Sequence, residues 1–462
     1  MIDSMSKDDA AIKRAALLVA TLTSFLTPFM GSSVNIALPS IGREFNMNAV
    51  LLGWIATSYL LAAAMFLVPF GRIADIYGRK RIFINGILTY AVSSFLSSVA
   101  PSAVWLLAFR VLQGIGSAMI FGTGIAILTS VYPAGERGRV LGINVAAVYS
   151  GLSLGPFLGG FLTQHLGWRS IFFLNVPLSL IIIAFVLWKL KGEWAEAKGE
   201  KFDLTGSIIY ILTLPAMMYG LSLLPATAGV WLILLGVLGL IALAKWEMKV
   251  KSPVLDMNLF RNNTVFAFSS LAAFINYGAT FAIGFLLSLY LQYTKGLDPQ
   301  HAGFILVSQP AVMALFSPLS GRLSDKIEPR IVASIGMGFT AMGLFLFTFL
   351  NSNTGIPFVV ISLIVVGFGL ALFSSPNTNA IMSSVEKRFY GVAAATVGTM
   401  RLTGQMFSMG ISMLVLALYM GHAQVSPENY PLFLKSTKSA FIIFTALCFA
   451  GIFASLSRGK VR

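Results

Sequence analysis

A ten-residue motif occurs in two similar but not identical copies in this chain, 250 positions apart, and each copy lies between two long apolar runs. The first copy is GRIADIYGRK from Gly71, and the second is GRLSDKIEPR from Gly321. A loop repeated between apolar segments of membrane-spanning length indicates a duplicated helical bundle. In secondary transporters the substrate path runs between two such halves, so the repeat predicts a transporter before any residue is given a chemical role.

The composition places the chain in a lipid bilayer. Hydrophobic residues make up 57% and charged residues 11% of its 462 residues, which leaves too little polar surface to cover a water-soluble globule. Apolar runs of membrane-spanning length recur about fourteen times. They lie at 15–38, 51–70, 82–100, 103–130, 139–164, 170–189, 204–224, 229–246, 264–292, 302–321, 331–350, 356–377, 390–419 and 439–457. We therefore expect an all-α membrane protein with fourteen transmembrane helices.

The basic residues predict the orientation of these helices. With the N-terminus in the cytoplasm, the inner loops and tails hold 25 Lys and Arg residues, and the outer loops hold 5. Cytoplasmic loops of membrane proteins carry such an excess. We therefore expect a protein of the prokaryotic cell membrane with both termini in the cytoplasm. The net charge of +15 then reflects topology, and a nucleic-acid partner is not expected.

The repeat also divides the chain. If each repeated loop follows the second helix of its half, the six-helix bundles are 15–190 and 264–457, with cytoplasmic tails at 1–14 and 458–462. Residues 191–263 remain between them and hold two extra central helices with polar flanks. The later polar flank either forms a helix in the membrane interface or is a solvated connector.

The fifth predicted span contains the glycine-rich string GLSLGPFLGG. Gly151, Gly155 and Gly159 recur every four residues, so they share one helix face and let a neighbouring helix approach closely. Pro156 removes a backbone hydrogen bond and can bend the helix, and Gly160 completes the string. Glycine spacing alone is common in membrane helices, whereas the full string is specific.

With these motifs the chain resembles the major facilitator superfamily and, within it, the fourteen-span drug:proton antiporter family. GRIADIYGRK is similar to the superfamily motif between spans 2 and 3, and GLSLGPFLGG is similar to the span 5 motif associated with antiporters. WRSIFFLNVP from Trp168 resembles the family's entry into span 6. The span 4 motif is matched by Leu106, Arg110, Gln113, Gly114, Gly116, Ser117 and Ala118. The resemblance implies a proton-coupled exporter of amphipathic drugs that alternates access between two halves; we expect a monomer without a cofactor.

The motif between spans 2 and 3 is expected to act as a conformational latch. Its glycines allow tight turns, and its aspartate can pair with a cation or accept hydrogen bonds from helix-terminal N–H groups. Such a latch closes the cytoplasmic side in one state and releases it in the other. A loop that only sets orientation is the alternative, but it does not explain the aspartate. The latch residues of the two copies are Gly71, Asp75, Gly78, Arg79, Lys80, Gly321 and Asp325.

Two arginines, Arg110 and Arg401, fall inside predicted spans. An arginine at mid-span costs about 2.5–3.5 kcal/mol on insertion scales, so it is expected to face the bundle interior. Gln113 follows the first arginine, and Gln405 follows the second. We expect these residues to line a substrate or proton pathway; the alternatives are a clamp on buried carbonyl groups and a bond between helices. No third charged residue is expected to be clearly buried.

The carboxylate typical of proton coupling is missing from the predicted membrane core. In span 1, where similar proteins often carry an aspartate, this chain has Met30. Proton-coupled antiporters usually rely on a buried carboxylate whose pKa shifts as access alternates. Coupling could instead involve Asp75, Glu44 or another carboxylate at a span edge together with Arg110. Otherwise the substrate could carry the proton or charge, or the protein could be an uncoupled facilitator. Arginines without a buried acid predict an electropositive cavity that favours anionic or neutral amphiphiles.

Polar and aromatic residues at mid-span depth complete the candidate pathway. Each either contacts a substrate or ties neighbouring helices together. They are Asn35, Tyr59, Asn144, Tyr149, Asn276, Tyr277, Gln309, Asn377 and Asn379.

Enzyme, nucleotide and metal chemistry are not expected. The chain has no GxxxxGK[ST] loop, a single cysteine, and histidines without metal-ligand spacing. The alternatives to an exporter are a uniporter or symporter of a specific organic anion, and a membrane sensor or scaffold without transport.

Overall fold

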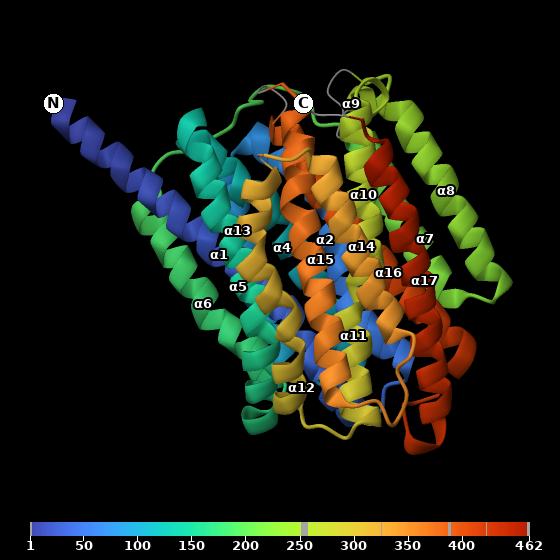
Figure 1. Cartoon of the computed structure of the whole chain (residues 1–462). Coiled ribbons are helices and arrows are strands. Elements are labelled where there is room, and N and C mark those ends of the chain that lie inside the picture. Colours follow the sequence, from blue (N-terminus) through green and yellow to red (C-terminus); the bar gives the residue numbers. More distant parts are fainter. Residues whose placement is uncertain (1, 251–256, 325, 387–389, 422, 460–462) are drawn as a thin grey trace.

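The structure is a computed structural model that describes residues 2–250, 257–324, 326–386, 390–421 and 423–459. Over these residues it is helical, with long helices packed side by side in one bundle (Figure 1). α1 begins and α17 ends at the same end of the bundle (Figure 1). We call this end the terminal face and the other end the opposite face.

Each half of the repeat forms its own set of helices. In the first half these are α1 Ile2–Phe45, α2 Ala49–Tyr77, α3 Arg79–Ser98, α4 Ala103–Val131, α5 Ala134–Leu166 and α6 Arg169–Lys189. The hairpin between the halves consists of α7 Leu204–Leu223 and α8 Thr227–Glu247. The second half comprises α9 Met257–Asn262, α10 Thr264–Thr280, α11 Ala282–Leu289, the π-helical turn Tyr290–Thr294, α12 Pro299–Leu306, α13 Ser308–Ser324, α14 Pro329–Phe347, α15 Ile356–Ser383, α16 Tyr390–Met420, the 3-10 turn Pro427–Asn429 and α17 Tyr430–Ser457.

Thirteen helical segments among the described residues are long and apolar enough to cross a membrane. The remaining expected span, 82–100, corresponds to α3, which has 20 residues and packs against α4 and α6. Its hydropathy is low because three basic residues begin it and four serines lie near its end. The serines are buried against protein. Mean hydropathy thus underestimates a helix that is covered by its neighbours.

The two halves repeat their packing. The contacts of α1 with α5, α2 with α4 and α3 with α6 recur as α10 with α16, α13 with α15 and α14 with α17. The expected span 302–321 is divided into α12 and α13 near Pro310, whose missing N–H weakens the helix there. The halves meet where α2 lies against α16 and where α5 lies against α12 and α13.

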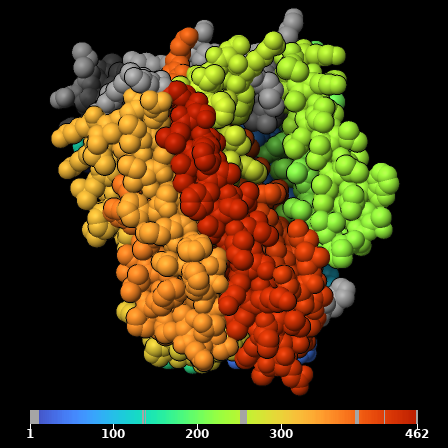
Figure 2. All heavy atoms as spheres, turned by 45° about the vertical axis from the view of Figure 1, so that its right-hand side comes forward, coloured from blue at the N-terminus to red at the C-terminus, as the bar shows by residue number. Residues whose placement is uncertain are grey.

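The α7–α8 hairpin lies outside the two bundles. Figure 2 shows it as the green flank of the molecule. Its inner helix, α7, contacts both halves, because it packs against α2 and α16. The Tyr210 hydroxyl donates to the Ala64 carbonyl of α2 at 3.0 Å, and Met218 lies against Gly410 of α16. The hairpin therefore covers the junction between α2 and α16.

Candidate functional site

The glycine string of α5 allows close contact with α1. A Cβ atom on Gly151 would overlap the carbonyl oxygen of Phe25, and one on Gly155 would overlap the Ser32 hydroxyl. A Cβ atom on Gly159 would lie 2.7 Å from the Cα atom of Ser33. Distances this short are absent between real side chains, so α1 can pack here only because these positions lack a side chain.

The same string also touches the second half of the chain. A Cβ atom on Gly160 would overlap the carbonyl oxygen of Pro299, at the start of α12. A Cβ atom on Gly303 of α12 would overlap the carbonyl oxygen of Pro156. α5 therefore joins α1 on one side and the second half on the other, toward the opposite face.

The repeated motif is largely helical and not a loop. The expectation of a turn at Gly71 is wrong, because α2 continues to Tyr77; Gly71 instead lies close to Gly122 of α4. Gly321 is likewise helical, inside α13. Gly78 does form a turn, with φ of 118°, and this backbone conformation favours glycine. Asp325 lies outside the described residues.

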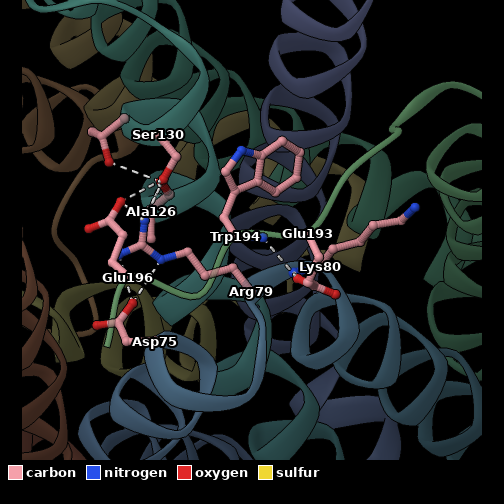
Figure 3. A network of polar contacts seen from close by, with 9 residues as sticks. Asp75, Arg79, Lys80, Ala126, Ser130, Glu193, Trp194 and Glu196 are labelled. Carbon is pink, nitrogen blue, oxygen red and sulfur yellow. Dashed lines mark hydrogen bonds and ion pairs between the residues drawn. The ribbon is translucent and has the colours of Figure 1, made fainter. Parts of the chain in front are cut away.

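Arg79 is the centre of a polar network at the terminal face (Figure 3). Its Nε donates to Asp75 Oδ1 at 2.7 Å, and its Nη1 donates to the Ala126 carbonyl at 3.2 Å. The same nitrogen contacts Ser130 Oγ and lies 2.7 Å from Glu196 Oε1. The Lys80 side chain points away from Arg79 (Figure 3), and its backbone N–H bonds to Glu193. Neither glutamate was among the predicted site residues, although both belong to the polar stretch of mixed charge after α6.

Arg110 is held inside the first half. Its side chain is buried, and its Nε donates to the Ile55 carbonyl of α2 at 3.1 Å. Its Nη1 donates to Gln113 Oε1 at 2.5 Å. The guanidinium carbon lies 4.4 Å from the centre of the Tyr59 ring, whose hydroxyl is 2.7 Å from Ser117 Oγ. In this conformation Arg110 clamps a buried carbonyl group, which was the alternative to the expected pathway role.

Arg401 of α16 points across to the first half. It is half-buried, and its guanidinium carbon lies 5.9 Å from the centre of the Phe121 ring on α4. It forms no side-chain hydrogen bond with a described residue. Arg401 thus lies where α16 of the second half faces α4 of the first half.

Two tyrosines from different halves meet at one serine. Tyr149 of α5 donates to Ser374 Oγ of α15 at 2.8 Å, and the Tyr277 hydroxyl of α10 is 3.4 Å from the same oxygen. Both tyrosines were candidates, whereas Ser374 was not. A serine in an apolar span that precedes Pro376 could have been noted as a further polar residue.

The other amide candidates differ in whether their side-chain atoms have hydrogen-bond partners. Asn144 ties α5 to α1, since it accepts from Ser24 at 3.0 Å and donates to the Ala20 carbonyl at 3.3 Å. In contrast, the buried Asn276 has no partner for either amide atom among the described residues, and Asn35 has none for its Oδ1. Gln309 and Gln405 are half-buried. Buried amide atoms without partners are costly and suit positions that a ligand or water contacts.

Asn377 and Asn379 follow Ser374 on α15, toward the terminal face (Figure 1). Asn379 donates to Ser324 at 3.1 Å, and Asn377 Oδ1 accepts from Arg458 at 2.7 Å. Arg458 is fully buried and also contacts Ser269, Ser455 and the Pro329 carbonyl. The expectation that no third charged residue is clearly buried is therefore wrong. Burial lowers the pKa of Arg458 to about 10, so it remains charged at neutral pH.

Acidic groups lie at the ends of the helices. Glu44 of α1 accepts from Trp168 Nε1 and from Arg169, each at 2.7 Å. Asp298 caps α12, and the backbone N–H of His301 holds the pKa of this carboxyl below its usual value. The described residues include one buried acid, Glu247, which ends α8. Met30 is buried without a neighbouring carboxylate in the described part of α1.

The chain matches one family over most of its length. The family model described as Major Facilitator Superfamily matches residues 20–255 and 269–460. The chain belongs to this superfamily. It is therefore a membrane transporter and not an enzyme, and its superfamily carries small molecules through a path between two helical bundles.

Several characterised proteins resemble this superfamily member. The riboflavin transporter RibZ of Clostridioides difficile is 27% identical over 445 residues, which cover 95% of this chain and 96% of that protein. The multidrug resistance protein Stp of Mycobacterium tuberculosis is 29% identical, over 87% of this chain and 76% of that protein. A bacterial homologue of the human lysosomal transporter Spinster shares the fold with a TM-score of 0.66 and 17% identity, covering 96% of this chain and 97% of that one.

Proposed function

We propose that this superfamily member exports amphipathic organic compounds that are neutral or anionic. The observation that carries the proposal is the charge of its core. Arg110 is buried and Arg401 is half-buried beside α4, whereas the buried acid of the described residues, Glu247, ends a helix of the outer hairpin. A core with this balance attracts negative charge and disfavours cations.

The groups around these arginines suit an aromatic ligand. Tyr59, Tyr149 and Tyr277 offer hydroxyl groups beside flat apolar rings, and Phe121 presents another ring next to Arg401. Pockets that bind small molecules combine apolar walls with a few polar groups in this way. Relatives named as transporters of riboflavin and as multidrug resistance proteins support a substrate of this kind.

Proton coupling is part of the proposal. Asp75 lies near the terminal face and Glu44 near the opposite face, and each carboxylate is paired with an arginine at 2.7 Å. Each could be exposed to a different side of the membrane as access alternates. We propose that these carboxylates bind and release protons as their arginine pairs loosen.

The topology follows from the basic residues. We propose that the terminal face lies in the cytoplasm of a prokaryotic cell, because the inner loops and tails predicted from the sequence hold 25 Lys and Arg residues and the predicted outer loops hold 5. The rocking units are residues 15–190 and 264–457, and the functional form is a monomer.

A facilitator or symporter of a specific organic anion is the second candidate. The observation in its favour is Met30, a buried apolar side chain where the family resemblance implies a proton-binding carboxylate. A sensor or scaffold without transport is the third possibility, and the same assay distinguishes it.

The test uses purified full-length protein in liposomes that contain a pH-sensitive dye. A pH gradient is imposed, and matched cationic, neutral and anionic aromatic amphiphiles are added. We expect neutral or anionic compounds to trigger proton movement. Compound flux without proton flux would favour the facilitator, and preference for cations would contradict the proposed charge selectivity. The absence of both fluxes would support the sensor.

A further inference from the structure

The segment between α6 and α7 lies directly on the turn between α2 and α3. We call residues 193–200 the clasp segment. The Arg79 N–H donates to the Trp194 carbonyl at 2.8 Å, and the Ala197 N–H donates to the Asp75 carbonyl at 2.9 Å. These two backbone hydrogen bonds fix the clasp segment on both sides of the turn.

Glu193 binds the start of α3. Its Oε1 accepts from the Lys80 N–H at 2.7 Å, and its Oε2 accepts from the Arg81 N–H at 3.3 Å. A carboxylate at this place satisfies N–H groups that the helix leaves free and interacts favourably with the helix dipole. A Cβ atom on Gly78 would lie 2.6 Å from the Glu193 carboxyl carbon. The turn glycine thus leaves room for the glutamate.

Glu196 binds the buried cation of the motif. Its Oε1 lies 2.7 Å from Arg79 Nη1 and accepts from Ser130 of α4 at 3.0 Å. Figure 3 shows Asp75, Ser130 and Glu196 converging on the Arg79 guanidinium. The Arg79 side chain is 8% exposed, whereas that of Glu196 is 64% exposed. The contact therefore joins a buried cation to an exposed carboxylate, and water can readily take the place of this carboxylate as a partner of Arg79.

A third carboxylate extends the same contact. Glu200 forms an ion pair with Arg72 of α2 at 2.5 Å. Three acidic residues within eight positions thus bind three different groups of the α2–α3 region. A solvated connector would not be expected to place each of its acids on a separate donor.

The second half has a different arrangement at the matching place. Pro329 begins α14 as Arg79 begins α3, and its carbonyl accepts from Arg458 at the end of α17. The second half thus supplies its buried guanidinium from its own last helix. The first half uses acids from the chain that leads to α7, and α7 in turn contacts both halves through α2 and α16.

We propose that Glu193 and Glu196 are positioning residues that hold the α2–α3 turn in the arrangement seen here. Release of the clasp segment then frees Arg79 and Asp75 for the other access state. The proposal rests on the proposed function in one respect, namely that transport involves motion of the halves.

The test measures distances between the halves in the absence of substrate. Spin labels are placed at Arg139 on α5 and Ser383 on α15, which are exposed at the terminal face of different halves. Cys448 is buried and stays in place. In the Glu193→Gln/Glu196→Gln variant we expect the ratio of the distance populations to change about threefold. A change of this size is typical of the loss of exposed ion pairs.

Two controls separate positioning from general structure. Glu136→Gln removes one acidic charge, that of the Lys13 ion pair on the same face, and should leave the distances unchanged. High salt should shift the unmodified protein toward the double variant and should not shift the double variant further. Equal distances in the double variant and the unmodified protein, or an equal effect of Glu136→Gln, would overturn the proposal. Failure to find a transported compound would affect the proposed function and not this measurement.

Discussion

The side-chain amide of Asn175 on α6 donates a hydrogen bond to the sulfur of Met30 on α1 across 3.0 Å. Met30 is fully buried, and Asn175 Oδ1 has no partner among the described residues. A thioether is a weak acceptor, whereas a carboxylate at this place would accept a stronger hydrogen bond. The first half therefore keeps an amide donor beside the position at which similar proteins often carry an aspartate.

Met30→Asp should strengthen proton coupling. The new carboxylate would accept from Asn175 and would add a group that can bind a proton inside the core. We expect proton flux triggered by amphiphiles to rise about tenfold, which corresponds to about 1.4 kcal/mol, and cationic compounds to become substrates. The dye assay in liposomes measures both effects. Met30→Asn is the matched control without charge, and an equal response of the two variants would refute the role of the carboxylate.

Arg110→Ala and Arg401→Ala should separate stability from substrate binding. Arg110 bonds the Ile55 carbonyl and Gln113, so its removal leaves buried acceptors unpaired and should cost about 2–3 kcal/mol of stability. Arg401 has no such bonds to described residues, so its removal should leave the melting temperature nearly unchanged. It should weaken binding of anionic compounds about tenfold, through loss of one charged contact. Thermal unfolding in detergent and binding titrations measure the two effects. Unchanged binding of anionic compounds by both variants would remove the basis for the proposed selectivity.

The sequence was sufficient for the fold because apolar runs and the internal repeat report directly on membrane helices. It was less informative about partners that lie far apart along the chain. Glu196 is 117 positions from Arg79, and nothing in the charge pattern of its stretch specifies which cation it meets. Arg458 follows the last apolar run directly, and hydropathy therefore placed it in a tail. Its burial depends on acceptors from α10, α14 and α15, which only the packing brings together.

Among the central candidates, only contacts between residues close together in the sequence could be predicted. Arg110 and Gln113 are three positions apart on one helix, so their contact could be inferred from helical geometry. Tyr149 and Tyr277 come from different halves and meet through Ser374, which no local pattern reveals. Gly71 was interpreted as a turn because glycine permits one, whereas α2 continues through this position to Tyr77.

Arg458→Leu should destabilise the protein, although it removes a buried charge. Ser269 and Asn377 would lose a charged donor, at a cost of about 2 kcal/mol or roughly 5 °C in melting temperature. In the first half the matching residue is Leu190, which also ends its bundle's last helix and lies in an apolar cluster with Val19 and Gly124.

The matched control copies this apolar cluster into the second half. The variant Ser269→Val/Asn377→Gly/Arg458→Leu removes the donors and acceptors together, and such replacement is often tolerated. We expect it to recover most of the lost melting temperature. The triple variant could instead be less stable than Arg458→Leu by the sum of the separate costs of Ser269→Val and Asn377→Gly. In that case the polar cluster would not act as a unit.

Gly160→Ala should oppose the close contact between α5 and α12. The added methyl group would overlap the Pro299 carbonyl oxygen, and overpacking of this kind costs about 1–3 kcal/mol. Since the contact joins the two halves, the cost falls on the conformation seen here and should shift the population toward an open opposite face by about tenfold. Spin labels at Leu166 and Asn353, exposed on different halves, would report longer distances. Gly142→Ala is the control on the same helix, because nothing lies within 4 Å of the added atom. Identical distances in the two variants would show that the α5–α12 contact does not close this face.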